Sequence, residues 1–162
     1  MLESFVGKSL DELDRLMLDV LQREAQLSNV DLSRRVNLSP PAIHTRIKRL
    51  WKDGIIRRQV VILDQEKLGF GLLCFIHVGT SGHQVDQLKT FEESVKSIKE
   101  VLECHHLTGE YDYLLKVIVK DRKGLQNLVR KLNSLSCVSR IQTSVTLEEV
   151  KYSTALPLLE DE

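Results

Sequence analysis

The stretch Ser39–Lys52 combines an apolar stripe with a polar, largely basic opposite face. At 100° per residue, Ile47 and Leu50 fall within about 40° of Ile43, so the three side chains share one side of a helix. Arg on the other side can pair with guanine O6 and N7, while Thr and His can reach base edges or phosphates. We therefore predict a helix that enters the major groove of DNA. Its candidate contacts are Ser39, Pro41, His44, Thr45, Lys48, Arg49 and Lys52.

Basic charge gathers around this stretch although the chain as a whole is neutral, with 23 Lys and Arg against 23 Asp and Glu. Residues 29–58 hold eight basic and two acidic side chains. A phosphate backbone responds to such a local patch more than to the total charge. A solvated basic face is the alternative interpretation, and further arginines on either side of the helix weigh against it. These additional candidate contacts are Arg34, Arg35, Arg57 and Arg58.

A polar turn, Thr108-Gly-Glu-Tyr-Asp112, lies between two β-rich segments. Gly109 permits a close backbone approach, and the polar and aromatic neighbours could bind a zwitterion. Taken by themselves, these residues favour a plain hairpin connection with a packed Tyr over a binding site.

No catalytic or metal centre is predicted. On a strand, Cys104 and His106 share one face while His105 points to the other, and no fourth ligand group is evident. Three cysteines without metal-type spacing indicate reduced thiols in a reducing compartment. We found no long apolar run for a membrane span, no secretory signal and no nucleophile–base arrangement. We therefore expect a cytoplasmic, non-enzymatic protein without a cofactor.

The N-terminal part has the pattern of a helix-turn-helix. A capping box at Ser9-Leu-Asp-Glu12 predicts a helix that runs to about Glu24, and a second, short helix begins at Ser28. Asn37-Leu-Ser39 forms the turn, and the third helix ends at Gly54. A β-rich run, Ile55–Leu63, follows. Residues 1–63 are thus predicted to form a winged-type helix-turn-helix domain with a following strand.

The remainder has an alternating pattern after a Gly-punctuated linker at residues 64–71. The pattern gives the order β-α-β-β-α-β, which is that of a ferredoxin-like module in an α+β protein. We assign residues 72–162 to this domain. Its predicted elements are strands Leu72–Val78, Val101–Leu107, Tyr113–Val119 and Val138–Val150, and helices Val85–Ile98 and Leu125–Leu132.

Taken in order and spacing, these stretches resemble the Lrp/AsnC family of regulators, also called feast/famine regulatory proteins. The resemblance rests on Leu10–Arg15, Asn29–Val36, Leu38–Pro41, Arg46–Leu50, Asp53–Ile56, Glu103–His105, Thr108–Leu115 and Glu148–Val150. It implies dimers that assemble into tetramers or octamers, and binding of free amino acids between dimers beside the turn. The effector role would fall on Thr108, Gly109, Glu110, Tyr111 and Asp112, with Thr143 and Ser144 as neighbours.

The chain departs from the commonest family pattern at Glu110, where many members have Asp, and at Trp51 and the Pro40-Pro41 pair. The first change leaves the ligand open, and the others leave the base preference open. The leading hypothesis is a transcriptional regulator that binds pseudo-palindromic DNA with A·T-rich spacers and responds to an amino acid.

Two alternatives remain at this stage. An effector-independent architectural DNA-binding protein would keep the helix but show no amino-acid response. An enzyme similar to sirohaem decarboxylases would need a tetrapyrrole pocket with His and Arg, and the purified protein would take up porphyrin.

Overall fold

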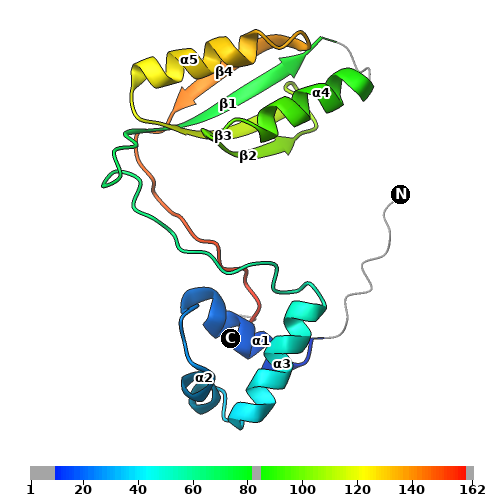
Figure 1. The fold of residues 1–162 in the computed structure, drawn as a ribbon, viewed down its shortest axis with the longest axis vertical. Coiled ribbons are helices and arrows are strands. Elements are labelled where there is room, and N and C mark those ends of the chain that lie inside the picture. Colours follow the sequence, from blue (N-terminus) through cyan, green and yellow to red (C-terminus); the bar gives the residue numbers. More distant parts are fainter. Residues whose placement is uncertain (1–9, 82–84, 160–162) are drawn as a thin grey trace. The chain divides into compact units, whose positions relative to one another are not determined.

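A computed structural model describes residues 10–81 and 85–159, which form two compact units (Figure 1). One unit contains the described chain up to Val61 and from Lys151 onward; the other is Ile62–Val150. The sequence predicts residues 72–162 as one domain, whereas the C-terminal tail, residues 151–159, groups with the N-terminal helices. The tail joins the N-terminal helices because the side-chain amide of Gln22 bonds both backbone groups of Leu156, at 3.0 and 2.7 Å.

The three predicted helices of the helix-turn-helix are confirmed as α1 (Glu12–Arg23), α2 (Asn29–Arg35) and α3 (Pro40–Lys52). The capping box of α1 is formed by Asp11 and Asp14, whereas the predicted capping residue Ser9 lies outside the described residues. Ser28 caps α2 by accepting from the Asp31 N–H at 3.1 Å. Asn37 adopts the left-handed backbone conformation, with φ 53°, that the turn requires.

The core of this helical unit is small. Met17 from α1, Leu32 and Val36 from α2 and its end, and Ile43 from α3 are buried against one another. Leu50 is also fully buried. The apolar stripe predicted for α3 therefore faces the other helices, and the opposite side of α3, with His44 and Lys48, is exposed.

The predicted strand within Ile55–Leu63 is absent from the described chain, where residues 57–64 form neither helix nor strand. A strand needs a neighbour for its backbone N–H and C=O groups, and none of the described strands pairs with this segment. The side chains of Val60, Val61, Ile62 and Leu63 are all exposed.

The second unit is the expected α+β module. It contains β1 (Leu72–Thr80), α4 (Val85–Lys96), β2 (Val101–His106), β3 (Tyr113–Val119), α5 (Arg122–Asn133) and β4 (Val138–Val145). The antiparallel sheet has the order β2-β3-β1-β4, and α4 and α5 cover one face (Figure 1). The last strand ends at Val145, which pairs with Cys74, and not at the predicted Val150. One further backbone bond runs from the Thr146 N–H to the Leu73 carbonyl at 2.9 Å, close to the start of β1 at Leu72.

Side chains from alternate strand positions fill the space between the sheet and these helices. Cys74, Ile76 and Val78 of β1 are fully buried. Neighbouring strand residues and the inner faces of the helices complete the cluster, among them Tyr113, Leu115, Val117, Phe91, Val95, Leu128 and Leu132. Odd-numbered positions of β1 therefore lie on the other, helix-free face.

Candidate DNA-binding and effector sites

The outward face of α3 carries the predicted contacts. Lys48 and Lys52 have no ion pair among the described residues, and His44 is exposed beside them. The Thr45 hydroxyl donates to the Pro41 carbonyl at 3.0 Å, so it keeps only acceptor capacity for a further partner. Ser39 and Pro41 lie exposed at the N-terminal end, where Ser39 precedes the first turn without a side-chain capping bond. The face thus offers two free lysines and several polar groups.

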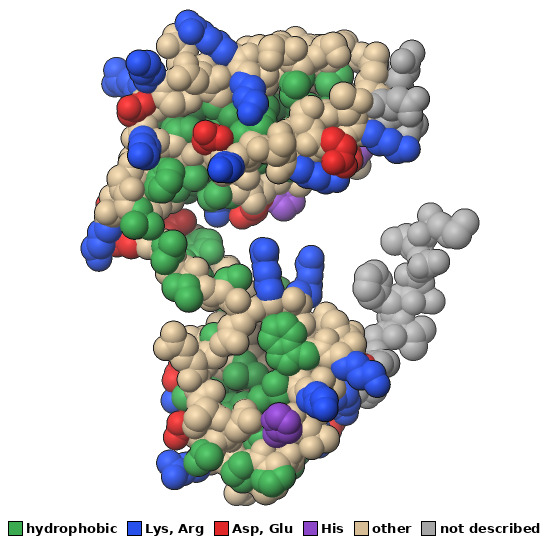
Figure 2. All heavy atoms as spheres, in the orientation of Figure 1, with side chains coloured by type: hydrophobic (Ala, Val, Ile, Leu, Met, Phe, Trp, Pro, Cys, Tyr) green, Lys and Arg blue, Asp and Glu red, His purple; other side chains and the backbone are tan. Residues whose placement is uncertain are grey.

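The arginines predicted to support this face divide into two groups. Arg34 pairs with Asp31 at 3.5 Å, and Arg35 forms a two-nitrogen pair with Glu24 whose longer bond is 2.8 Å. The bond from Arg35 lowers the pKa of the Glu24 carboxyl, and the same bond raises the pKa of Arg35. Arg57 and Arg58 are exposed and have no ion pair within the described part of the chain. Figure 2 shows Lys and Arg side chains on the visible surface of this unit.

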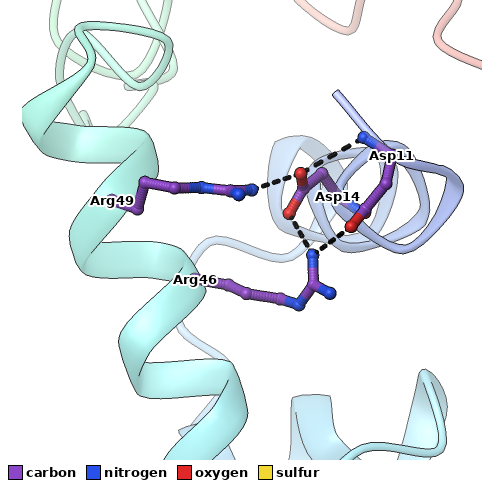
Figure 3. A network of polar contacts seen from close by, with 4 residues as sticks. All are labelled: Asp11, Asp14, Arg46 and Arg49. Carbon is purple, nitrogen blue, oxygen red and sulfur yellow. Dashed lines mark hydrogen bonds and ion pairs between the residues drawn. The ribbon is translucent and has the colours of Figure 1, made fainter. Parts of the chain in front are cut away.

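Arg49, the predicted guanine contact, points toward α1 (Figure 3). Its Nη2 donates to Oδ2 of Asp14, and Nη1 of Arg46 donates to Oδ1 of Asp14 at 2.8 Å and to Oδ2 of Asp11 at 2.6 Å. The bond from Arg46 is the main cause that lowers the pKa of Asp11. Arg49 is therefore engaged within the helical unit.

Sequence reasoning overlooked Asp14 and Arg46. The available signal was the position of Asp14 in α1, three and four residues before Met17 and Leu18, which places a carboxylate in the buried stripe. A buried carboxylate requires partners, and a basic neighbour on a packed helix is the expected one.

The predicted effector turn is fastened to the sheet by Asp112. The Asp112 carboxylate accepts from the Thr80 N–H at 2.6 Å and from the Thr80 hydroxyl at 2.8 Å. Its backbone N–H donates to the Val78 carbonyl at 3.0 Å, and its carbonyl accepts from the Leu107 N–H at 2.8 Å. Gly109 has φ 130°, a conformation that side-chain-bearing residues rarely adopt. Asp112 therefore sets the position of the turn.

Two residues of β4 that sequence reasoning omitted contact the turn. Arg140 donates to the Glu110 carboxylate at 3.1 Å and lies 4.3 Å above the Tyr111 ring. The Tyr111 hydroxyl donates to Oε1 of Gln142 at 2.8 Å. A Cβ on Gly79 would lie 2.8 Å from Cγ of Arg140, so the small residue in β1 leaves room for this arginine. The turn and β4 thus build one polar and aromatic surface.

The register separates Thr143 from that surface. Thr143 pairs with the buried Ile76 on the helix-covered face, whereas Gln142 pairs with His77, whose ring lies 5.3 Å from that of Tyr111. Ser144 shares the face of Gln142 but lies two positions farther along the strand, opposite Phe75. The sequence could place both residues in β4, but the alternation that selects Arg140 and Gln142 depends on the strand register.

A separate cavity of about 460 Å³ lies between α4 and β2. Its lining includes the pair in which the Tyr113 hydroxyl donates to Glu92 at 3.0 Å. His106 stacks on the Tyr113 ring, with centroids 4.7 Å apart. Burial, followed by the bond to Glu92, raises the pKa of Tyr113. None of the residues predicted for the effector site lines this cavity.

Within residues 10–81 and 85–159, no group of three or more His, Cys, Asp and Glu side chains could hold a metal ion. In the same ranges, no helix is both long and apolar enough to cross a membrane. Cys74, Cys104 and Cys137 are free thiols.

Comparison with known proteins matches both units. Residues 10–57 match a winged helix-turn-helix DNA-binding family, and residues 73–156 match the Lrp/AsnC ligand-binding domain. The DNA-binding transcriptional activator DecR of Escherichia coli is 38% identical over 150 residues, which cover 92% of this chain and 99% of that protein. The chain belongs to the Lrp/AsnC family.

Other Lrp/AsnC proteins give the same result. The leucine-responsive regulatory protein of Escherichia coli is 37% identical, over 93% of this chain and 92% of its own. A transcriptional regulator from Neisseria meningitidis, solved in complex with L-Met, is 40% identical with a TM-score of 0.89, and the match covers 93% and 97% of the two chains. The predicted fold and family are confirmed, and this Lrp/AsnC chain is a DNA-binding transcriptional regulator with a ligand-binding domain.

Proposed function

We propose that this regulator inserts α3 into the major groove of DNA and adjusts its assembly or DNA affinity when an amino acid binds the turn at residues 108–112. The observation that supports the DNA-binding part is the outward face of α3, where Lys48 and Lys52 are free of ion pairs among the described residues. Opposite them, Ile43 and Leu50 are fully buried. Only the polar face of the helix is then available to a groove.

Within this face we assign the contacts by chemistry. Lys48, Lys52, Arg57 and Arg58 would contact phosphates, and His44 and Thr45 would approach base edges. At the helix N-terminus, Pro40 and Pro41 carry no N–H group, so the Ser39 hydroxyl would donate to a phosphate and Pro41 would pack against the DNA backbone. Arg34 and Arg35, each paired with an acid, would contribute less.

The DNA-binding proposal is tested with Lys48→Ala. A phosphate contact changes the slope of log K against log salt by about 0.9, which corresponds to roughly fivefold weaker binding per protomer at about 0.15 M salt. Fluorescence anisotropy should show this loss on every DNA sequence. Lys67→Ala, in the turn that follows Asp64, is the control because it removes the same charge outside α3. Equal losses in both variants would contradict the assignment.

For the effector we propose a free amino acid, as supported by the L-Met complex of the related Neisseria meningitidis regulator. Arg140, with Nη1 on Glu110, has further donors that suit a carboxylate, and Gln142 and the backbone of the turn offer acceptors for an ammonium group. Calorimetry with each of the twenty amino acids tests this. Absence of binding at millimolar concentration would favour the effector-independent architectural protein.

We further propose that the chain acts as dimers that assemble into larger even-numbered oligomers in the cytoplasm. Val60, Val61, Ile62 and Leu63 form a continuous run of exposed apolar side chains, and Figure 2 shows hydrophobic side chains along the connecting chain. Such a run is costly in water and is typically covered in an assembly. Light scattering on the full chain tests this, and a monomer at micromolar concentration would contradict it.

We also propose that the protein is a regulator and not an enzyme. No nucleophile–base motif stands out in the sequence, and the relatives are transcriptional regulators. A sirohaem-decarboxylase-like activity would require uptake of a tetrapyrrole. Addition of porphyrin to the purified protein, followed by gel filtration, should leave the protein fraction without porphyrin absorbance.

A further inference from the structure

A buried carboxylate connects the proposed DNA-binding helix to α1. Asp14 is fully buried, and its oxygens accept from Arg46 at 2.8 Å, from Arg49 and from the Asp11 N–H at 3.3 Å (Figure 3). An ionised carboxylate in such a place is strongly destabilising unless it is paired and hydrogen-bonded. The two guanidinium groups are therefore held at the position of Asp14.

This network removes positive charge from the surface that faces DNA. Asp11 and Asp14 balance Arg46 and Arg49, so the four side chains together are neutral. The side chain of Arg49 is still 47% exposed, so release from Asp14 would be enough to make it available to a phosphate. A free guanidinium binds phosphates whatever the base sequence, which strengthens non-specific binding.

The position of Arg49 on α3 supports this view. On the helical wheel Arg49 lies 60° from Arg46, and both side chains reach the same carboxylate on α1. Lys48 lies 100° away from Arg49 and has no ion pair among the described residues. One flank of α3 is thus committed to α1 and the adjoining flank is free.

We propose that Asp14 is a positioning residue that determines DNA specificity. It holds Arg49 and Arg46 on the α1 side of α3, keeps both away from the phosphate backbone, and leaves recognition to the face with His44 and Lys48. This inference rests on the proposed groove-facing role of α3.

The test compares Asp14→Asn with Asp19→Asn. Asp19 is the matched control because it is also on α1 and also pairs with an arginine, Arg23, but has no bond to α3. Anisotropy titrations from about 50 to 200 mM salt use two probes: poly(dI–dC), and a duplex recovered with the wild type by selection from random sequences. Circular dichroism confirms that each variant is folded.

Asp14→Asn should bind poly(dI–dC) more tightly, by roughly fivefold per freed guanidinium at about 0.15 M salt, with a slope steeper by about 0.9. On the selected duplex, where the contacts of His44 and Lys48 already hold α3 in the groove, the gain should be smaller, so the preference for that duplex should fall. Asp19→Asn should change neither quantity beyond a small effect of its lost charge. A residue that only stabilised the fold would give the opposite sign, with weaker binding to both DNAs, and that result would overturn the proposal.

The variant Arg49→Gln is a second test of the proposal, and it does not require that Asp14→Asn folds. Because Arg49 is withheld from DNA, this variant should keep the wild-type slope on poly(dI–dC), and the double variant with Asp14→Asn should lose most of the gain. A shallower slope in Arg49→Gln alone would overturn the proposal. If the wild type does not distinguish the two probes, the groove-facing role of α3 fails, and this inference fails with it.

Discussion

The two units hold their functional surfaces in place by different means. In the helical unit, four buried side chains form the core cluster, and α3 is fastened to α1 by the carboxylate of Asp14. In the second unit, thirteen buried residues lie between a four-stranded sheet and two helices, and the turn at residues 108–112 is positioned by a backbone ladder and Asp112. A small core and a charge network should be more sensitive to single substitutions than a large core with a ladder.

The two units also differ in what fixes the orientation of their functional side chains. In the sheet, the register fixes which face Arg140 and Gln142 occupy, since a shift by one residue would move both to the opposite face. In the described part of the helical unit, no backbone bond links α1 to α3, so side-chain contacts hold these two helices together. Substitutions that change the charge of Asp14, Arg46 or Arg49 should therefore have a larger effect on DNA recognition than on the fold of the helical unit.

The largest expected effect comes from a matched pair of core truncations, Ile43→Ala and Leu115→Ala. Both side chains are fully buried, and such changes cost about 2–5 kcal/mol. We expect Ile43→Ala to unfold the helical unit at growth temperature, because its core is small. Leu115→Ala should leave the sheet unit folded, with a lower thermal unfolding midpoint, because its core is larger. Calorimetric scans should show only the transition of the sheet unit for Ile43→Ala, and two separable transitions for Leu115→Ala. Loss of both units in either variant would show that they unfold as one.

The next effect concerns the turn. Asp112→Ala removes the acceptor for both Thr80 groups, so the turn should lose its position and amino-acid binding should fall by about tenfold or more, since hydrogen bonds to a charged group contribute about 1.5–3 kcal/mol each. DNA binding by the helical unit should be unchanged. Calorimetry and anisotropy measure the two activities, with Glu149→Ala as the control for loss of an exposed acid. Equal amino-acid affinity in Asp112→Ala would place the effector elsewhere.

Most of the fold could be predicted because its signals are local. The apolar period of α3, the left-handed Asn37 and the alternating β-α-β-β-α-β pattern each follow from residues close together in the chain. The prediction of a strand within Ile55–Leu63 was wrong for the described chain. Residues with high β propensity form a strand only where another strand pairs with them, and none does so here. The tail could not be placed, since the bond from Gln22 to Leu156 joins residues 134 positions apart.

The candidate sites were predictable in composition but not in geometry. The polar types on α3 were evident, yet whether Arg49 faces DNA or Asp14 depends on how two helices pack. Likewise the turn was evident, while Arg140 and Gln142 become its neighbours only through the pairing of β1 with β4. Helix packing and strand pairing bring together residues that are far apart in the sequence, and they therefore determine which polar side chains share a site.

A smaller effect concerns the stability of the sheet unit at high pH, to which Tyr113 contributes. Burial and the bond to Glu92 raise the pKa of Tyr113 above its usual 10.0, so the unfolded chain releases this proton first as the pH rises. The stability that Tyr113 contributes is complete below pH 10.0 and is lost above it. The unfolding midpoint of the sheet unit should therefore fall more steeply in alkali for the wild type than for Tyr113→Phe. Parallel curves for the two proteins would contradict this assignment.

The smallest expected effect concerns the C-terminal tail, which belongs to the helical unit although it follows the last strand. Gln22 both donates to and accepts from the backbone of Leu156, so Gln22→Ala removes two bonds that hold residues 151–159 on α1. At a net value of about 1 kcal/mol for the exposed pair, the Leu156 amide should exchange its hydrogen roughly fivefold faster.

Hydrogen exchange followed by NMR measures this directly, and Gln26→Ala, an exposed glutamine in the loop after α1, is the matched control. The thermal midpoint should hardly move in either variant, because the buried cluster around Met17 and Ile43 is untouched. If Leu156 exchanges at the same rate in Gln22→Ala and in the wild type, other contacts hold the tail. The C-terminal tail would then stay on the helical unit without Gln22. Within this unit, only the contacts between α1 and α3 would depend on single side chains.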